Sequence, residues 1–515
     1  MNIETFMSIQ ITKVCTVLRF YTCAALFLSV FHVSAQNLVN GLHLDIEASG
    51  TVSSGTMAPL WLSNNRYGVV SPYANSAYER VGAFRDLETD SARQWRRGYG
   101  VDLLLSQNST SKFMVHQAYF EAGYKKAVLS IGAKERLIDL RNNELTSGGL
   151  SNGINAHPIP QARLDIDYFS FPYTKGWWKW KMRASFGITT DAGWQKDFVK
   201  PNGKYTSNIL YHEKALYWKF GKETATKVPL TFEIGIQMFT QFGGKAYNVL
   251  GRASQQLTDI KMAQNGGAFL RAITGQGRDI IDFTESNSLG NTLGSYNMRL
   301  AWHGRTGSGK TWQVGAYFER YFEDQSMLTL QYGIQDHLLG IDATLPANPF
   351  VSSVVVEHVS TKDQSGAVYH DKTKSIPDKM NGRDNYYNHS IYSGWQHWGM
   401  GIGHPLLTSP VYNEDHTITF YNTRLKAWHF GLSGDPTPEL HWRLMLTLTQ
   451  NWGTYDIPFA EKLNQQYYMA EVGWKPRFAK GWSGKLAFGL DHGDLLGNSV
   501  GGQITIHKTL QWNGK

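Results

Sequence analysis

Apolar and polar side chains alternate with a period of two residues along much of this chain. In Trp178–Ile188 every even-numbered position is apolar, and the positions between them carry lysine, arginine, serine or glycine. Leu230–Met238, Leu440–Leu448 and Gly502–Trp512 repeat the pattern, with Lys508 as an exception on an apolar face. A helix would mix the two sets of side chains around its surface, whereas a strand places them on opposite faces. The pattern therefore predicts amphipathic β-strands.

Strands of about ten residues, separated by turns rich in glycine, asparagine and aspartate, are typical of a transmembrane β-barrel. One face meets lipid, the other meets the lumen, and closure of the sheet pairs every backbone group. A soluble sandwich or propeller would show the same alternation. Like charges on the polar faces, tryptophans near strand ends such as Trp177 and Trp482, and the lack of a regular repeat favour the barrel. The predicted fold class is an all-β, antiparallel transmembrane barrel.

Three segments interrupt the strand pattern. Pro72–Leu87 and Arg252–Ile273 are predicted to form short helices. Such helices must cap or plug the barrel, because a helix facing lipid would be longer and more apolar. The polar stretch Glu357–Ser390 is predicted to be a large surface loop.

The first 35 residues have the features of a secretory signal peptide. A positively charged lead precedes the apolar run Phe20–Val33, and small residues precede a cleavage site after Ala35. Cys15 and Cys23 both lie in this segment, so the mature chain is expected to have no disulfide and no thiolate ligand or nucleophile. Residues 36–515 are predicted to form a single barrel domain in the bacterial outer membrane.

The overall charge adds one point about partners. A formal net charge of +8 would suit a nucleic-acid-binding protein, but export separates the chain from that partner. After Val33 no apolar run is long enough to form a transmembrane helix. We therefore expect contact with outer-membrane lipid through barrel strands, and no nucleic-acid partner.

The segment Gly304–Thr311, GRTGSGKT, matches the phosphate-loop pattern G-x-x-x-x-G-K-[ST] at every required position. A working phosphate loop follows a buried parallel strand and opens a helix, whose amides bind phosphate. Here both flanks, Ser295–His303 and Trp312–Phe322, alternate as amphipathic strands do. The segment is therefore predicted to be a hairpin turn with Arg305 and Lys310 in solvent. Neither a nucleotide nor another cofactor is expected.

Six segments, in order through the mature chain, carry a family resemblance: Met57–Gly68, Asn155–Ile166, Asn287–Leu300, Tyr317–Met327, Gly394–Pro410 and Trp428–Tyr455. Together they resemble the capsule assembly Wzi family, in the form found in the Bacteroides group. The resemblance implies an eighteen-stranded outer-membrane barrel, a small helical bundle on the periplasmic side and extracellular loops that close the mouth. It also implies a lectin that helps attach capsular polysaccharide to the cell, and no enzymatic activity. One departure is the end of the chain, where three residues follow Trp512 although many such barrels end on an aromatic residue.

A polysaccharide is bound through aromatic faces, hydroxyl-pairing side chains and, where the sugar is acidic, cations. The stretch from 369 to 398 is rich in these groups. The candidate glycan-binding residues are Tyr369, Lys379, Arg383, Tyr386, Tyr387, His389, Trp395 and Trp398. The alternative is that the aromatic residues belong to a belt at the membrane surface and the cations merely face solvent.

Lys179, Lys181 and Arg183 form a basic ladder on the face predicted to line the lumen. The ladder could attract anions, or it could balance carboxylates on neighbouring strands. The candidate carboxylates are Glu233, Glu319 and Glu471. Three functions therefore stay open: a monomeric capsule-anchoring lectin, a porin or exporter channel for anionic glycans or other anions, and a barrel enzyme acting on glycan or lipid.

Catalytic and metal-binding motifs give the enzyme little support. His397 and His404 lie near Trp398 in the sequence, and Asp491–Asp494 places carboxylates around a histidine. On a strand, however, neighbouring residues point to opposite faces, and this spacing makes no convincing metal site. The sequence contains neither G-x-S-x-G nor H-E-x-x-H. We expect no catalytic residue and no metal site.

Overall fold

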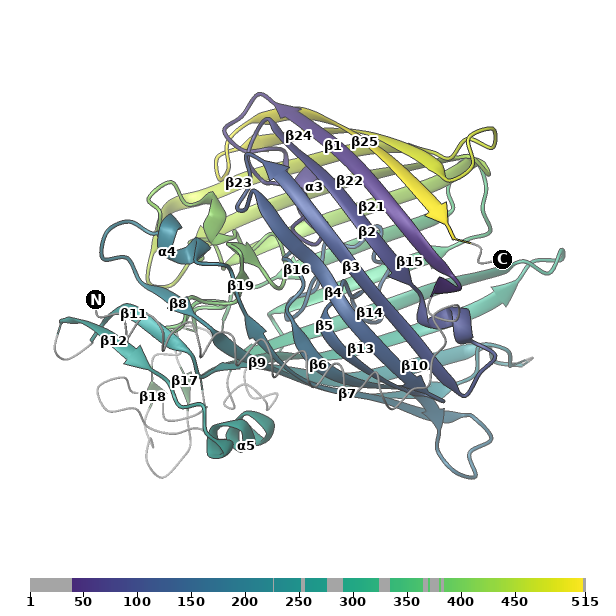
Figure 1. Cartoon of the computed structure of the whole chain (residues 1–515), viewed down its shortest axis with the longest axis horizontal. Helices are drawn as coiled ribbons and strands as arrows, with labels where there is room; N and C mark the ends of the chain where they lie inside the picture. Colours follow the sequence, from purple (N-terminus) through teal and green to yellow (C-terminus); the bar gives the residue numbers. More distant parts are fainter. Residues whose placement is uncertain are drawn as a thin grey trace.

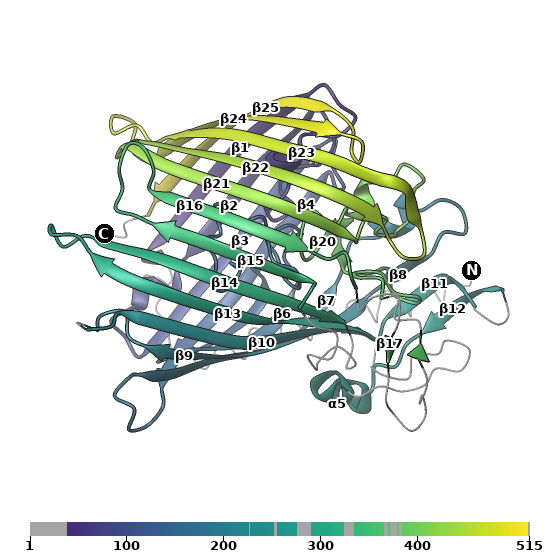
Figure 2. The same ribbon diagram turned by 180° about the vertical axis from the view of Figure 1, so that it is seen from behind.

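The computed structural model describes residues 39–225, 227–251, 255–275, 290–323, 334–364, 369–370, 379–380 and 384–512. Within these residues, eighteen strands form one antiparallel sheet that closes on itself (Figures 1 and 2). The barrel strands are β1 (Leu42–Ser53), β2 (Ser76–Arg85), β3 (Trp95–Gln107), β4 (Phe113–Tyr124), β5 (Ala127–Ala133), β6 (Gln161–Ser170), β7 (Trp178–Thr189), β9 (Ile209–Gly221), β10 (Leu230–Phe242), β13 (Asn291–Arg305), β14 (Thr311–Glu323), β15 (His337–Thr344), β16 (Ser353–Ser360), β21 (Leu425–Thr437), β22 (Leu440–Gly453), β23 (Pro458–Trp474), β24 (Trp482–Gly493) and β25 (Ser499–Gln511).

Each barrel strand pairs with the barrel strands before and after it in the chain, and β1 also pairs with β25. This last pairing leaves the sheet without a free edge, as a lipid environment requires. The predicted antiparallel all-β barrel and the strand number implied by the family resemblance are both confirmed.

The two ends of the barrel differ in their connections. Leu42 of β1 pairs with Arg85 of β2, and His43 pairs with Gln511 of β25, so β1 begins where β25 ends. We call this end the terminal end and the opposite end the loop end. Strand connections at the terminal end are short, as between β21 and β22. The long connections all begin and end at the loop end, where they join β1 to β2, β5 to β6, β7 to β9, β10 to β13, β14 to β15 and β16 to β21.

The outside of the barrel is apolar. Along β24 and β25, Leu486, Phe488 and Ile504 are exposed, whereas the alternating residues Ala487 and Gln503 are buried toward the lumen. The period-two pattern in the sequence is thus confirmed as the difference between the outer and inner faces. Among the described residues, no helix has the length and apolar character needed to cross a membrane.

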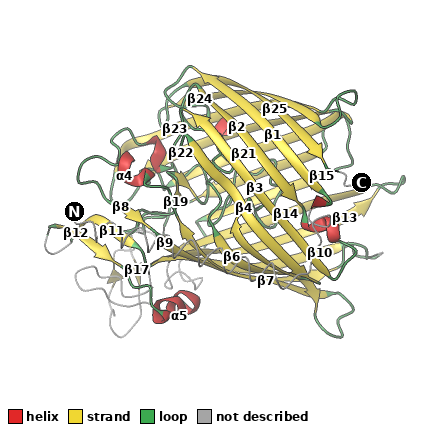
Figure 3. Ribbon diagram, viewed as in Figure 1, coloured by secondary structure: helices red, strands yellow, loops and turns green. Residues whose placement is uncertain are grey.

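Smaller elements lie at both ends, and Figure 3 shows that helices are few. At the loop end, β8, β11 and β12 form a three-stranded sheet that projects beyond the barrel wall (Figure 1). These elements are α3 (Leu60–Ser63), η1 (Leu87–Asp90), α4 (Trp194–Phe198), β8 (Tyr205–Ser207), β11 (Lys245–Leu250), β12 (Leu257–Lys261), α5 (Gly266–Thr274), β17 (Tyr369–His370), β18 (Lys379–Met380), β19 (Gln396–His397), β20 (Met400–Gly401) and η4 (Pro410–Tyr412).

Both helix predictions need correction. Within 72–87, Ser76–Arg85 form strand β2, because hydrogen bonding to β1 on one edge and β3 on the other outweighs the local helix signals. Within 252–273 the helix begins only at Gly266, where the Asn265 side chain accepts a hydrogen bond from the amide of Ala268 at 3.0 Å. The residues before it include strand β12. Of the helical bundle implied by the resemblance, the described residues at the terminal end contain only η1.

The hairpin prediction for GRTGSGKT is confirmed. Strand β13 ends at Arg305, β14 begins at Thr311, and the two pair directly across the turn. The backbone amide of Thr306 donates to the carbonyl of Lys310 at 2.8 Å, and Gly309 has a φ of 82°, which glycine adopts without strain. Strand β14 follows Lys310, so this turn lacks the helix N-terminus whose backbone amides would bind phosphate. The predicted surface loop 357–390 begins later than expected, because Glu357–Ser360 belong to β16.

Three loop-end segments fold back into the lumen. We call residues 54–75, 134–160 and 384–424 together the plug. Trp61, Leu150, Tyr387 and Phe420 of the plug are buried in one apolar cluster with side chains from the inner barrel wall, such as Phe239. Because this cluster lies inside the sheet, the described plug residues fill the lumen around it with packed side chains.

Candidate functional site

The aromatic residues predicted to bind glycan lie in the plug. Tyr386, Tyr387 and Trp395 have 0%, 1% and 0% of their surface exposed, so the expected surface position is wrong for all three. The Tyr386 hydroxyl donates to Asp336 at 2.9 Å, and the Trp395 indole donates to the carbonyl of Ser151 at 2.9 Å. These rings stabilise the plug instead of facing a polymer, and Trp395 does not belong to a membrane belt either.

Of the other predicted glycan-binding residues, Trp398 and His389 lie outside the apolar cluster of the plug. Trp398 is partly buried with its ring 6.1 Å from that of His157, and His389 is partly buried beside Tyr392. Tyr369 and Lys379 lie in the short hairpin of β17 and β18, in which Tyr369 pairs with Met380 and His370 pairs with Lys379. Arg383 lies outside the described residues.

Buried carboxylates on the barrel wall hold the second plug segment, 134–160. Glu319 of β14 forms an ion pair with Arg141 and accepts hydrogen bonds from the amides of Leu150 and Ser151 at 2.9 and 3.1 Å. Burial disfavours the charge of Arg141, but the nearby carboxylates overcome this and keep its pKa above the usual value.

Glu357 of β16 is a second anchor for the same plug segment. It accepts hydrogen bonds from the Thr146 hydroxyl at 2.6 Å and from the Ser147 amide at 2.7 Å. The Ser147 hydroxyl also lies 3.0 Å from Nε2 of His404, which joins the second plug segment to the third. Burial lowers the pKa of His404 to about 3, so its ring is neutral in the folded plug.

The remaining plug segment, 54–75, is anchored in the same way. Arg66 forms an ion pair of 2.9 Å with Glu471 of β23, and the amide of Leu60 donates to Asp491 of β24 at 2.8 Å. The Trp61 indole donates to the Thr447 hydroxyl at 3.0 Å. In the third segment, the Tyr387 amide donates to Glu323 of β14 at 2.8 Å. All three plug segments are therefore bound to the wall by polar contacts as well as by apolar packing.

The basic ladder is neutralised by carboxylates. Lys181 and Arg183 bind opposite oxygens of Asp139 at 2.7 and 2.6 Å, and Arg183 also contacts Glu213 at 3.2 Å. Balancing of the ladder, the alternative weighed from the sequence, is confirmed for these two cations. The carboxylates proposed from the sequence bind other partners, as Glu233 does with Lys219 at 3.3 Å.

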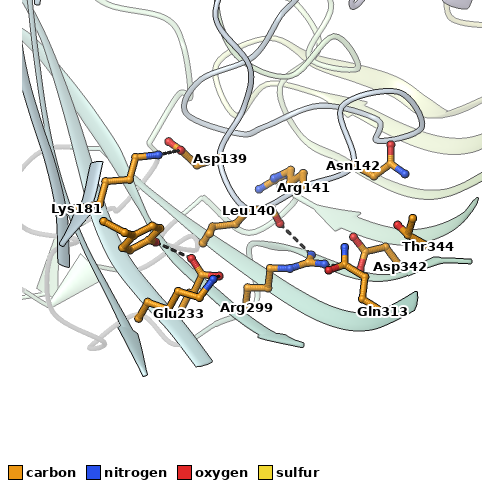
Figure 4. Close-up of a pocket in the computed structure, with 12 residues that line it drawn as sticks. Asp139, Leu140, Arg141, Asn142, Lys181, Glu233, Arg299, Gln313, Asp342 and Thr344 are labelled. Atoms are coloured by element: carbon orange, nitrogen blue, oxygen red, sulfur yellow. Dashed lines mark hydrogen bonds and ion pairs between the residues drawn. The ribbon is translucent and has the colours of Figure 1, made fainter. Parts of the chain in front are cut away.

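A cavity of about 390 Å³ remains in the terminal half of the lumen (Figure 4). Its roof is the plug segment 139–142, and its wall comes from seven barrel strands between β6 and β15. Most of its lining side chains are charged or polar. The lining residues are Asp139, Leu140, Arg141, Asn142, Tyr168, Lys181, Lys219, Glu233, Arg299, Gln313, Asp342 and Thr344.

The projecting sheet at the loop end carries a different kind of surface. Its inner face packs Ala246 and Val249 against the plug residues Ile391 and Tyr392. On its other face Tyr205 and Tyr247 pair across the strands with their rings stacked, 4.5 Å apart and 8° from parallel.

Charged groups border these stacked rings. The Lys245 ammonium lies 4.2 Å from the centre of the Tyr247 ring and 3.1 Å from the carboxylate of Asp259. Both tyrosines are partly exposed, and Asp259 is exposed. The sequence pattern does not reveal this group, because three-residue β8 is too short for a periodic signal and lies about 40 positions from Tyr247.

One group among the described residues has the donor atoms for a metal ion: Asp102, His116 and Glu135. In this structure the Arg80 guanidinium lies 2.6 Å from both carboxylates, and His116 contacts Glu135 at 2.9 Å. The cation that these carboxylates need is therefore supplied by Arg80, and the group fits a buried ion-pair network better than a metal centre. His397, considered from the sequence, contacts two backbone carbonyls through its ring nitrogens.

Comparison with known proteins identifies the fold. No protein-family model matches the sequence, and no curated protein matches it. Among solved structures, one similar chain is Wzi of Escherichia coli, described as an outer membrane protein involved in group 1 capsule assembly and as a carbohydrate-binding β-barrel. The TM-score is 0.54 with 12% identity, over 91% of this chain and 84% of that one. This chain shares the barrel fold of Wzi.

Outer-membrane porins are similar at a lower level. OprD of Pseudomonas aeruginosa aligns with a TM-score of 0.45 and 7% identity, over 92% of this chain and 94% of that one. A BenF-like porin of Pseudomonas fluorescens Pf-5 aligns with a TM-score of 0.45 and 8% identity, over 92% and 98% of the two chains. The alignment with Wzi shows the barrel architecture, and the function is argued from the site.

Proposed function

We propose that this protein is an outer-membrane carbohydrate-binding barrel that holds capsular polysaccharide at the cell surface by binding it, without catalysis. The observation that carries the proposal is the plug, which packs inside the lumen and is fixed to the wall at Glu319, Glu357, Glu471 and Asp491. A barrel closed in this way is suited to present a surface. Two further points support the proposal: the sequence resembles the Wzi family, and Wzi itself is described as carbohydrate-binding.

The channel alternative loses its main support. It rested on a positive lumen wall at Lys179, Lys181 and Arg183, and two of these three cations are paired with Asp139. A selective path for anions needs cations whose charge is not already balanced. We therefore expect the wild-type protein to give almost no conductance in a planar bilayer, and a steady large conductance would favour the porin.

The loop end is the surface we assign to the polysaccharide. Long loops of outer-membrane barrels face the exterior, and strand ends joined by short turns face the periplasm. On the loop end, Tyr205 and Tyr247 present aromatic rings to solvent, with Lys245 and Asp259 as hydrogen-bonding groups at their border. Sugar rings bind through this combination of an apolar face and polar rim.

A genetic experiment tests the role. Deletion of the gene is expected to release capsule into the medium, and the wild-type gene should restore cell-bound capsule. If the deletion strain keeps its capsule attached, the proposed role is wrong.

A second experiment tests the site. The double variant Tyr205→Ala/Tyr247→Ala should bind purified capsular polysaccharide at least about tenfold more weakly, because exposed tyrosine anchors dominate such interfaces. Tyr173→Ala is the matched control, since Tyr173 is fully exposed in a turn at the terminal end. Equal binding by the double variant and the control would remove this site while leaving the role intact.

A further inference from the structure

The cavity in the terminal half of the lumen has the properties of a second binding site. We propose that it binds a neutral carbohydrate of one or two sugar rings from the side opposite to the loop-end surface. That this side is the periplasm rests on the proposed function; the binding itself does not.

The roof of the cavity is held in a defined position. Leu140 has a φ of 61°, a left-handed conformation that is unusual for a bulky residue and that persists only where surrounding contacts impose it. On one side of it, Asp139 binds Lys181 and Arg183. On the other, the Leu140 carbonyl accepts a hydrogen bond from Arg299 at 3.1 Å (Figure 4). Side chains from β7 and from β13 thus hold this strained segment above the cavity.

Charges around the cavity alternate and are balanced. Lys219 lies 3.3 Å from Glu233, whose other oxygen accepts from the Tyr168 hydroxyl at 2.5 Å. Arg299 lies 2.8 Å from Asp342. An anion would have to compete with these carboxylates, and a cation would have to compete with the guanidinium and ammonium groups. The balance therefore selects against ions of either sign.

A sugar hydroxyl fits this lining because it donates one hydrogen bond and accepts others. It can donate to Glu233 or Asp342 while it accepts from the neighbouring Lys219 or Arg299. The side chains of Gln313 and Thr344 make no hydrogen bond to the described part of the chain, so they remain able to pair with a ligand. Together these groups provide both donors and acceptors around the whole cavity.

Size and closure define how much carbohydrate the cavity holds. A volume of about 390 Å³ is at the lower end of the range for ligand pockets, roughly 300–1,000 Å³. The plug closes the far side, so a polymer cannot pass through it. The cavity is therefore suited to a disaccharide or to the end of a chain.

Binding to the detergent-purified full chain tests this inference. The probes are maltose and N,N′-diacetylchitobiose as neutral disaccharides and glucuronic acid as an anionic sugar, measured by titration calorimetry and saturation-transfer NMR. We expect saturable binding of at least one neutral disaccharide and weaker binding of the anionic sugar. No binding of either disaccharide, or tighter binding of glucuronic acid, would overturn the proposal.

Variants then locate the site. Gln313→Leu combined with Thr344→Val keeps the side-chain volumes and every ion pair described above, and it should weaken disaccharide binding about tenfold through the loss of two hydrogen bonds. Lys310→Ala, in an exposed turn at the same end, should bind as the wild type does. Unchanged affinity in the Gln313/Thr344 variant would place the disaccharide elsewhere. Polysaccharide binding at the loop end is measured separately with Tyr205→Ala/Tyr247→Ala, so failure here is distinct from failure of the proposed polysaccharide role.

Discussion

Glu319 provides a direct test of whether plug segment 134–160 closes the lumen. Its side chain is fully buried on the inner wall, where it forms an ion pair with Arg141 and accepts hydrogen bonds from the amides of Leu150 and Ser151. The change Glu319→Ala would remove all of these contacts at once. It would leave the Arg141 guanidinium, itself almost fully buried, without the partner that balances its charge.

The expected loss of stability is large. Removing one member of a buried ion pair costs about 3–5 kcal/mol, and each buried amide left without an acceptor adds about 1–3 kcal/mol. At about 1.4 kcal/mol for each factor of ten, even the lower bound raises the population of released plug more than about 100-fold. Glu357 still holds Thr146 and Ser147, so we expect partial release of the segment and not loss of the barrel.

Single-channel recording and hydrogen exchange would measure this release. The wild type should be nearly silent in a planar bilayer, whereas Glu319→Ala should show frequent openings together with faster exchange in 134–160. Asp90→Asn is the matched control, because it breaks the buried pair of Arg85 and Asp90 at the terminal end, 3.0 Å apart, outside the plug. If Glu319→Ala shows the conductance and exchange of the wild type, Glu319 does not hold the plug and the reasoning is refuted.

Four further predictions use other parts of the chain. Below pH 6.5 the His404 ring takes up a proton when the plug is released, whereas the folded plug keeps the ring neutral. The free energy that holds the plug in place should therefore fall by about 2 kcal/mol between neutral pH and pH 5. Faster hydrogen exchange in 384–424 would show this, and unchanged exchange would contradict it. Gly340→Ala would put a methyl group 2.2 Å from the buried Tyr317 ring. It should lower the free energy of unfolding by about 1–3 kcal/mol, seen as a lower unfolding temperature on heated gels. Lys310→Ala should change stability by less than about 0.5 kcal/mol and ATP binding, measured by calorimetry, should be undetectable in both proteins. Mass spectrometry of the mature protein should find Gln36 at its N-terminus, and a retained leader would contradict the signal-peptide prediction.

The strands and their faces can be read from the sequence because a strand alternates its side chains strictly. The pattern in Trp178–Ile188 predicts β7, which the structure places at Trp178–Thr189. The same reasoning identifies GRTGSGKT as a hairpin turn, since its flanks alternate on both sides. Lipid outside and polar groups inside impose this period on every strand, so the information is local.

Strand number and the course of segment 72–87 depend on more than local pattern. The number eighteen came only from the family resemblance, because alternation does not show how many strands close a sheet. Segment 72–87 has local helix signals, yet it pairs on both edges as β2. Its pairing partners, β1 and β3, decide its conformation, and the local pattern of the segment does not show them.

The candidate site also depends on contacts that the local sequence does not show. Aromatic residues in a polar stretch, such as Tyr386 and Tyr387, indicate a surface when only neighbouring residues are considered. The structure buries them because 384–424 folds into a lumen whose inner wall supplies apolar partners and hydrogen-bond acceptors. The sequence by itself determined the barrel strands, their two faces and the tight turn. Tertiary structure alone decided which charges pair, as between Arg183 and Asp139, because closure of the barrel brings residues from distant parts of the chain into contact.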